Sequence, residues 1–269
     1  MVNCNLIHGD CLVEMDKLIR GEQKVDLVLT DVPYGTTACK WDSIIPFDKM
    51  WDCLDELTNK TTPILLFGDE PFSSRLRLSN LNNWKYDWIW IKEGPSNIFN
   101  AKKRPLKYHE TISVFYKKLG KFYPNRIMIP RSKGGSERVE QGKKRGDIRI
   151  NPANSTVVGK GTKSGLYISN IPEYDSTMKY PSQHIYFSRV KSNSHEKVDH
   201  PTQKPVKLLE HFIKTYTDEG DIVLDFTMGS GSTGVACLQT NRNFIGIELD
   251  ENYYNIAKER CKTYQSKLW

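Results

Sequence analysis

The fold is most strongly constrained by short apolar runs that each close near an acidic residue and alternate with segments of helical spacing. The runs at 5–8, 25–30 and 62–67 are of this kind, and the same design returns at 220–225 and 242–248. Strands that alternate with helices indicate a parallel sheet covered on both faces. We therefore predict an α/β fold with a doubly wound, mostly parallel sheet.

Segments with helical spacing fill the gaps between these runs. In PFDKMWDCLDEL, Phe47, Met50 and Leu54 fall on one helix face. The segment VKLLEHFIKTY has the same spacing and follows Pro205, a residue suited to the first turn of a helix. Asp250 is placed to cap a last helix over ENYYNIAKERCKTY. YDWIWIK and HETISVFYK are predicted as two further strands.

The middle of the chain breaks this pattern. Between about residues 119 and 196, segments such as RSKGGSERVEQGKKRGD are rich in glycine and charge, and no long periodic element persists. A stretch of this length inside a compact domain indicates a functional insertion or loop more often than a linker. We predict one domain made of two halves, 1–118 and 197–269, with 119–196 inserted between them.

Positive charge is concentrated in one region. The chain has a net charge of +7, and residues 101–150 alone hold fifteen Lys and Arg against four acids. Clustered cations favour a polyanion, although a solvated basic loop would have the same composition. Aromatic residues in the same region, among them Tyr108, Phe115 and Tyr123, favour a folded surface over a solvated tail. A polyanion, whose phosphates these cations would neutralise, is therefore the expected partner.

The remaining composition excludes several classes of protein. The 269 residues are enough to bury a full core, and the six cysteines form no C-x-x-C pair and have no histidine at ligand spacing. We expect reduced thiols and no metal site. No signal-peptide pattern and no apolar run of membrane-spanning length is found in the sequence. The sequence thus predicts a soluble, cytoplasmic protein that is not bound to a membrane.

A glycine loop follows the strand predicted at 220–225. Gly229, Gly231 and Gly234 match the spacing of a dinucleotide-binding loop, and Glu248 follows at the end of the next strand, in reach of a ribose. Asp225 stands directly before the loop, where a carboxylate would repel a diphosphate. It would suit a ligand that carries an ammonium group. S-adenosylmethionine has an α-amino group, no phosphate and a ribose diol, so we predict it as the ligand.

A second acidic turn ends the strand at 25–30. Asp31 is followed by Val32, Pro33, Tyr34 and Gly35, and the carboxyl ends of parallel strands share one edge of a sheet. An exocyclic base amine is a poor nucleophile because its lone pair is delocalised into the ring. Hydrogen bonds from its two hydrogens to the Asp31 carboxylate and the Val32 carbonyl would free that lone pair, while Tyr34 stacks on the base. The base would have to leave the helix stack to reach this turn.

Together, these motifs resemble those of the β-class amino-group DNA methyltransferases. TDVPYG is similar to the D-P-P-Y motif of that family, LDFTMGSGSTG to its methyl-donor loop, and HPTQKP to its N-terminal cofactor motif. The order of the motifs, with a basic region between them, is that of the β-class. NAKKRPLKYHETISVFYK resembles its later catalytic strands, so the resemblance covers most of the chain outside 119–196. It implies the Rossmann-like methyltransferase fold with a seven-stranded type of sheet.

The resemblance also implies a role for each matched residue. It makes 1–118 the catalytic half, 197–269 the cofactor-binding half and 119–196 the target-recognition region. The implied catalytic turn is Asp31, Val32, Pro33 and Tyr34. The implied donor site contains Asp10 on the adenine of the donor, Thr202 and Lys204 near its methionine carboxylate, Glu248 on its ribose, and the loop residues Asp225, Phe226, Gly229, Ser230 and Gly231. Cys11 is included beside Asp10, with a purely structural role as its alternative, and His200 is interpreted as structural.

Val32 departs from the family pattern, which has proline at that position. The predicted role there is that of a main-chain carbonyl, which valine also supplies, and Pro33 still favours an extended backbone at Val32. The leading acid of the motif resembles the adenine-modifying members, so we predict an N6-adenine methyltransferase acting on double-stranded DNA. A cytosine-N4 enzyme and a DNA-binding relative without turnover remain the alternatives. A homodimer and a cognate restriction enzyme are further candidate partners. Lys143 and Lys144 are expected to contribute to DNA binding.

Overall fold

The computed structural model describes residues 2–35, 43–130, 148–151, 156–159 and 177–266. The chain forms two compact units, one made of Met1–Tyr123 with Ser182–Trp269 and the other of Pro124–Pro181. Lys143 and Lys144 lie outside the described residues. No helix within the described ranges is long and apolar enough to span a membrane.

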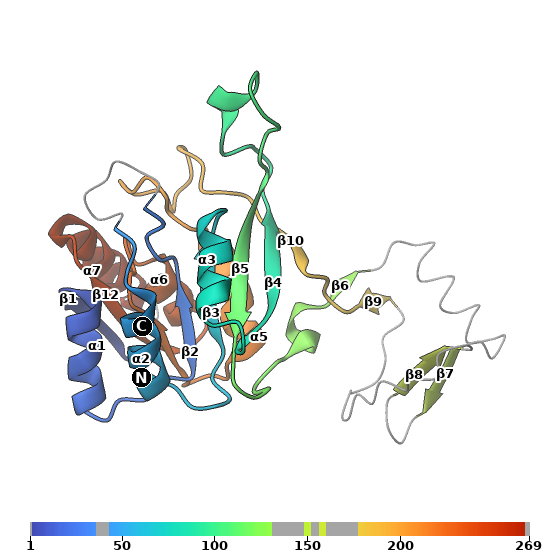
Figure 1. Cartoon of the computed structure of the whole chain (residues 1–269), viewed down its shortest axis with the longest axis horizontal. Helices are drawn as coiled ribbons and strands as arrows, with labels where there is room; N and C mark the ends of the chain where they lie inside the picture. The colour runs from blue at the N-terminus through green and yellow to red at the C-terminus, as the bar shows by residue number, and fades with distance from the viewer. Residues whose placement is uncertain (1, 36–42, 131–147, 152–155, 160–176, 267–269) are drawn as a thin grey trace. The chain divides into compact units, whose positions relative to one another are not determined.

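The first unit is built on a sheet of eight described strands (Figure 1). Neighbouring strands are parallel except β5, which runs antiparallel to β3 and to β4. The predicted α/β fold with a mostly parallel sheet is therefore confirmed. In spatial order the strands are β1 (Cys4–His8), β12 (Asn243–Glu248), β11 (Ile222–Asp225), β2 (Leu27–Thr30), β3 (Ile64–Gly68), β5 (His109–Phe115), β4 (Trp84–Ile91) and β10 (His184–Tyr186).

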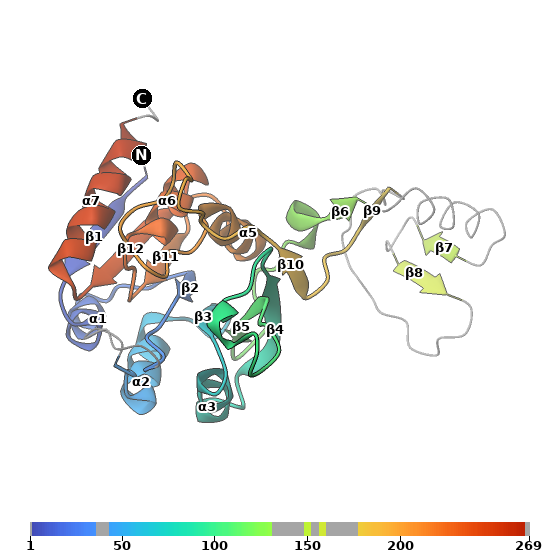
Figure 2. The ribbon, with the colours of Figure 1, turned by 90° about the horizontal axis from the view of Figure 1, so that it is seen from above.

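Helices cover both faces of this sheet. In Figure 2, α1 (Cys11–Arg20), α2 (Phe47–Leu57) and α3 (Phe72–Ser79) lie on one face, and α5 (Val206–Tyr216), α6 (Ser232–Gln239) and α7 (Glu251–Gln265) lie on the other. This arrangement explains why β2 is buried along its whole length and reads as a continuous apolar run. It also explains the predicted helix face of α2, where Met50, Trp51 and Leu54 are buried.

Among the α-helices and strands of this first unit, α3 and β10 are not predicted by the sequence. The N-cap residue of α3 is Pro71, whose side chain cannot accept a capping hydrogen bond, and only Phe72, Ser73 and Leu76 of the helix are buried. The strand β10 lies within the range 119–196, where we expected no regular element of the main domain, yet it pairs in parallel with β4 through His184, Ile185 and Tyr186. Because it is only three residues long, its periodicity is invisible in the sequence.

The second unit contains two small antiparallel ribbons. One pairs β6 (Ile129–Pro130) with β9 (Met178–Lys179), and the other pairs β7 (Ile148–Asn151) with β8 (Thr156–Gly159). A short 3-10 turn, η2 (Pro124–Ile127), precedes them. The unit falls within the predicted insertion 119–196, whose role in target recognition stays a prediction.

Candidate active site

The turn after β2 presents the predicted catalytic residues. The hydroxyl of Tyr34 donates a hydrogen bond to Asp31 Oδ1 at 2.5 Å, and the Tyr34 ring packs on Phe72 with the ring centroids 5.0 Å apart. The side chain of Val32 is buried in the core beside α2 and attaches the turn to the core. The turn is therefore held both by this apolar contact and by the hydrogen bond between Tyr34 and Asp31.

The glycine loop between β11 and α6 is shaped by left-handed backbone conformations. Gly229 has φ 52° and Gly231 has φ 76°, and a Cβ atom on Gly231 would lie 2.8 Å from the Cβ of Ala257 in α7. The loop is tied to the end of β12, because Glu248 accepts hydrogen bonds from the backbone N–H groups of Gly229 and Asp250, both at 2.8 Å. Only glycine fits both the backbone angle and the close approach at Gly231.

Asp225 ends β11 as a buried carboxylate whose two oxygens both accept hydrogen bonds. Its Oδ1 accepts from Thr30 Oγ1 at 2.5 Å and from the backbone N–H of Thr227 at 3.2 Å, and its Oδ2 accepts from Thr233 Oγ1 at 2.6 Å. Burial raises the pKa of Asp225 to about 6, against the opposing effect of these hydrogen bonds. A cationic group bound next to Asp225 would offset the loss of solvation, favour the charged carboxylate and lower its pKa.

The two turns meet because β2 and β11 are adjacent parallel strands. Their register pairs Leu27 with Val223 and Val28 with Leu224, so both strands end at the same edge of the sheet. Threonine side chains connect the two ends: the Thr227 hydroxyl donates to the Asp31 carbonyl at 3.1 Å and lies 2.8 Å from the Thr30 hydroxyl. The catalytic turn and the glycine loop are thus fixed against each other.

A cavity of about 1290 Å³ opens at this edge of the sheet. Every predicted site residue except Gly231 lines it, from Asp10 near the N-terminus to Glu248 at the end of β12. A pocket for one small ligand is typically about 300 to 1000 Å³, so this cavity has room for a donor and a base together. Gly231 lies instead against α7, where it lets the loop turn.

Lys204, which the resemblance places near the methionine carboxylate of the donor, is paired with two acids of the protein. Its ammonium forms an ion pair with Asp31 Oδ2 and lies 3.7 Å from Glu110 Oε2 and 5.2 Å from the centre of the Phe67 ring. Burial lowers the pKa of Lys204, but Asp31 and Glu110 outweigh burial and raise it. Lys204 therefore connects the catalytic carboxylate to a second acid on β5.

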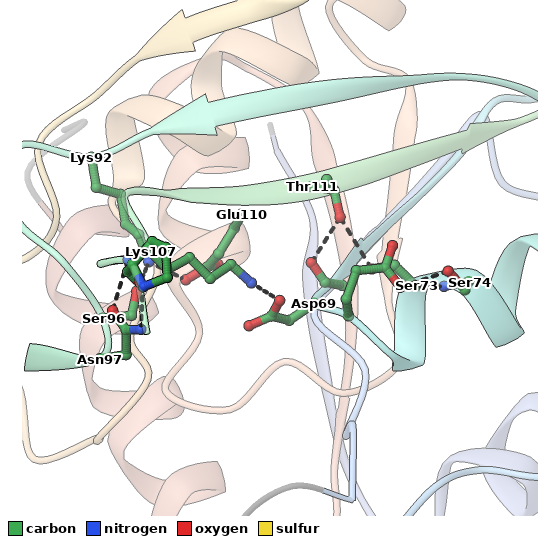
Figure 3. Close-up of polar contacts among 12 residues, drawn as sticks. Asp69, Ser73, Ser74, Lys92, Ser96, Asn97, Lys107, Glu110 and Thr111 are labelled. Atoms are coloured by element: carbon green, nitrogen blue, oxygen red, sulfur yellow. Dashed lines mark hydrogen bonds and ion pairs between the residues drawn. The ribbon is translucent and has the colours of Figure 1, made fainter. Parts of the chain in front are cut away.

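That second acid is held by another lysine. Lys92, at the end of β4, donates hydrogen bonds to Glu110 Oε1 at 2.7 Å and to Ser96 Oγ at 2.5 Å, and Figure 3 shows these three side chains converging. The coulombic attraction of Lys204 and Lys92 exceeds the effect of burial and lowers the pKa of Glu110. Asp31, Lys204, Glu110 and Lys92 thus form a continuous row of alternating charge along the cavity wall.

This row was not found from the sequence, although one signal for it exists. Lys92 directly follows the apolar run of β4, just as Asp31 follows that of β2. A charged residue at the carboxyl end of a predicted strand is therefore a signal for a residue of the site. Thr30 and Thr227 give no such signal, because a threonine at a strand end is common in ordinary turns.

The remaining predicted residues have structural contacts as well as cavity positions. Asp10 caps α1 by accepting from the N–H groups of Leu12 and Val13. Burial raises the pKa of Cys11 to about 12, so its thiol stays protonated, in keeping with the structural alternative. His200 lines the cavity beside Gly229, and burial together with Lys204 lowers its pKa to about 4, so its ring is neutral.

Comparison with known protein families identifies the family of this chain. A family model described as a DNA methylase matches residues 25–259, which include the catalytic turn, the glycine loop and the row of charges. The chain belongs to this DNA methylase family. The predicted methyltransferase identity and fold are thereby confirmed, and the family includes both adenine-N6 and cytosine-N4 enzymes.

Individual members of the DNA methylase family are similar over most of the chain. The DNA adenine methyltransferase YhdJ of Escherichia coli is 28% identical over 95% of this chain and 81% of its own length. The type II methyltransferase M.HpaI of Haemophilus parainfluenzae is 28% identical over 89% of this chain and 68% of its own. The crystal structure titled as the M1.HpyAVI–SAM complex superposes with a TM-score of 0.61 at 25% identity, covering 96% of this chain and 99% of that one.

The residues present fit S-adenosylmethionine, the ligand predicted from the sequence. A ligand with an ammonium, a diol and a carboxylate needs acidic and basic partners at separate points, and the cavity wall offers Asp225, Glu248 and Lys204. Each Glu248 oxygen receives one backbone N–H and retains a lone pair for a hydroxyl. Burial raises the pKa of Glu248, and the two backbone hydrogen bonds hold its carboxyl group in place for a hydroxyl donor.

Proposed function

We propose that this methyltransferase transfers the methyl group of S-adenosylmethionine to the N6 amine of an adenine in double-stranded DNA. The observation that carries the proposal is the fixed meeting of Asp31 and the glycine loop at one end of one cavity. The acid at the head of the Asp-Val-Pro-Tyr turn and the similarity to an enzyme named as a DNA adenine methyltransferase support adenine over cytosine.

The proposed donor site is formed by residues on both sides of the glycine loop. Asp225 would face the ammonium, Glu248 the ribose diol and Asp10 the adenine of the donor, with Thr202 and Lys204 near its carboxylate. When bound, S-adenosylmethionine supplies a methyl group activated by a positively charged sulfur. The protein's contribution is to hold that group still and to exclude water from it.

The proposed acceptor site is the catalytic turn. Asp31 and the Val32 carbonyl would accept hydrogen bonds from the two amine hydrogens, which localises the nitrogen lone pair. Tyr34, whose hydroxyl is bonded to Asp31, would stack its ring on the base. Because a base inside the duplex cannot reach the cavity, the adenine must turn out of the helix, at a cost of a few kcal/mol.

The test is incubation of the purified protein with S-adenosylmethionine labelled on its methyl group and with unmethylated genomic DNA. Digestion of the product to deoxynucleosides should give labelled N6-methyl-2′-deoxyadenosine, and sequencing around the label maps the recognition site. Labelled N4-methyl-2′-deoxycytidine would establish the alternative enzyme. If the protein bound the donor but transferred no label to any DNA, the alternative of a DNA-binding protein without turnover would be supported. A Val32→Pro variant that gained activity would then show that Val32 is the cause of the missing turnover.

The partners follow from this proposal. The proposed substrate is duplex DNA, and the proposed place of action is the cytoplasm. Several similar proteins are named as type II methyltransferases, so a cognate restriction enzyme is a proposed partner. A homodimer stays a prediction from the resemblance, and size measurement of the free protein would test it.

A further inference from the structure

The loop that joins β4 to β5, residues 94–107, stands at the mouth of the cavity and has no role in the proposed reaction. We name it the tip loop. Strand β4 runs in the same direction as β3 and β2, because β5 is antiparallel to both β4 and β3. The tip loop therefore leaves the sheet at the edge that carries Asp31. Its first residues, Gly94 and Ser96, line the cavity, and Figure 1 shows the loop extending beyond the ends of β4 and β5.

The base of the tip loop is held by several polar contacts. Asn97 bridges its two arms, donating to the Pro105 carbonyl at 3.1 Å and accepting from the Lys107 N–H at 2.7 Å. The N–H of Ser96 donates to the Lys107 carbonyl at 2.9 Å. Figure 3 shows Lys92 on Ser96 and an ion pair between Lys107 and Asp69 at the end of β3. The arms are thus joined to each other and to the cavity wall.

At the tip, this loop presents large apolar side chains to solvent. Phe99 is 98% exposed and Ile98 is 61% exposed. They belong to the 3-10 turn η1 (Ile98–Asn100), closed by hydrogen bonds from the N–H of Asn100 to the Asn97 carbonyl at 2.8 Å and from that of Ala101 to the Ile98 carbonyl at 3.1 Å. A hydrogen-bonded turn that holds two adjacent apolar side chains away from the core is typical of a contact surface.

The charge beside these side chains identifies the kind of partner. Lys102, Lys103 and Arg104 follow directly and are all exposed, and the range 94–107 contains no acidic residue. Lysine is depleted in the cores of protein–protein interfaces, whereas consecutive cations are suited to a phosphate backbone. An apolar side chain flanked by cations matches the devices that insert between base steps in DNA.

We propose that Phe99, supported by Ile98, inserts into the base stack of the DNA duplex and fills the space left by the target base when that base turns into the cavity. Lys102, Lys103 and Arg104 contact the phosphates on either side. The inference rests on the proposed function, since it requires a base to leave the helix. Stacking of the neighbouring bases on the inserted Phe99 ring offsets part of the free energy that unstacking the target base costs.

The experiment compares two duplexes that contain the mapped recognition site. In one the target adenine is paired, and in the other it faces an abasic position, so that it is already unpaired. The Phe99→Ala variant should lose about tenfold in kcat/KM on the paired duplex, the scale of one base–aromatic stack. On the abasic duplex the loss should shrink to about twofold or less, because less unstacking is needed. Phe99→Trp should retain activity on both.

The matched control is Leu78→Ala. Leu78 is 70% exposed and lies near the end of α3, before β4 begins, so it is at the opposite edge of the sheet, and its removal should change neither rate. All three variants should unfold at the wild-type temperature, since each altered side chain is exposed. A separate readout uses 2-aminopurine in place of the target adenine: binding of wild-type protein should raise its fluorescence, and Phe99→Ala should give a smaller rise.

Other outcomes would overturn the proposal. Equal loss of rate on both duplexes, or no loss on the paired one, would show that Phe99 does not assist base extrusion. If Phe99→Ala changed a dimer into a monomer in sedimentation and lowered both rates alike, the tip loop would be a contact between copies of the chain. If the wild-type protein methylated neither duplex and gave no 2-aminopurine signal, the proposed function itself would fail and the inference with it.

Discussion

At the scale of single residues, Asp31 is the group on which the proposed methyl transfer depends. Its two oxygens contact Tyr34 and Lys204, and of these two residues only Lys204 is also assigned to the donor, near its carboxylate. Because Lys204 also lies 3.7 Å from Glu110, it keeps an acidic partner when Asp31 is changed. The donor half of the cavity should therefore survive loss of the Asp31 charge.

We expect Asp31→Asn and Asp31→Ala to lower methyl transfer by on the order of a hundredfold or more, because the amine loses its charged acceptor. Donor affinity, measured by calorimetry, should stay within about twofold of wild type, a change of under about 0.5 kcal/mol. The asparagine variant keeps the volume of the side chain and so separates charge from packing. A collapse of donor binding in both variants would contradict this role for Asp31.

The second prediction at this scale concerns the pH dependence set by Asp225. Burial raises the pKa of Asp225 to about 6, so the protonated side chain fits the folded protein better than the charged one. Without donor, protonation of Asp225 therefore stabilises the fold at low pH, and this stabilisation is lost as the pH rises through about 6. The donor ammonium requires the charged form. Donor affinity should therefore rise by roughly tenfold between about pH 5 and pH 7, and the stabilisation by donor should be larger at the higher pH.

Calorimetric titration of the donor across this range measures the effect. Asp225→Asn should bind more weakly at neutral pH and show a flatter profile, since its amide does not titrate. Glu248, whose pKa is also raised by burial, remains in that variant and accounts for any residual slope. If the donor affinity of Asp225→Asn changed with pH as steeply as that of wild type, the titrating group would be a residue other than Asp225.

At the scale of elements, the row of alternating charge joins β4, β5, the segment before α5 and the catalytic turn. Lys92 and Lys204 are nearly buried, and Glu110 is the acid that they share. Removing one partner from a buried ion pair leaves a charge without compensation. We expect Glu110→Gln to lower the free energy of unfolding by on the order of 3 kcal/mol.

Denaturant unfolding measures this loss of stability: the midpoint denaturant concentration should fall, while the slope of the free energy of unfolding against denaturant concentration stays unchanged. The matched control is Glu93→Gln, two residues along from β4, where the carboxylate is more exposed and lies 3.9 Å from Lys191. An exposed pair contributes about 0.5 kcal/mol or less, so the control should unfold almost as wild type. Equal effects of the two variants would mean that the row of charges does not stabilise the fold.

The elements also show how far the sequence predicts the structure. The strands that carry Asp31, Asp225 and Glu248 were predicted because their apolar runs and glycine turns are local signals. Their adjacency in the sheet follows from parallel pairing, so the position of the cavity could be predicted. The partners of Lys204 could not, because contact with Glu110 depends on β5 reversing direction beside β3, a long-range choice that no local pattern encodes.

At the scale of the whole molecule, the charge is divided between two functions. The charges of the cavity are paired and mostly buried, which makes them insensitive to salt. The fifteen Lys and Arg of 101–150 carry the excess positive charge of the chain, part of it on the exposed tip loop. Donor binding should therefore vary little with ionic strength, whereas DNA binding should weaken steeply as salt is added.

The last prediction tests this division with Lys143 and Lys144, which lie outside the described residues and are chosen from the sequence. Replacing both with Gln should weaken DNA binding and reduce the slope of log Kd against log salt by about 1.8, the release of counterions from two phosphate contacts. Lys258→Gln with Lys262→Gln removes the same charge from exposed positions on α7 and should leave the slope unchanged. Fluorescence anisotropy of labelled duplex DNA at several salt concentrations gives both slopes. If the two double variants lowered the slope equally, DNA binding would depend on the net charge of the molecule rather than on the basic region, and the concentration of cations at 101–150 would have no specific function in binding.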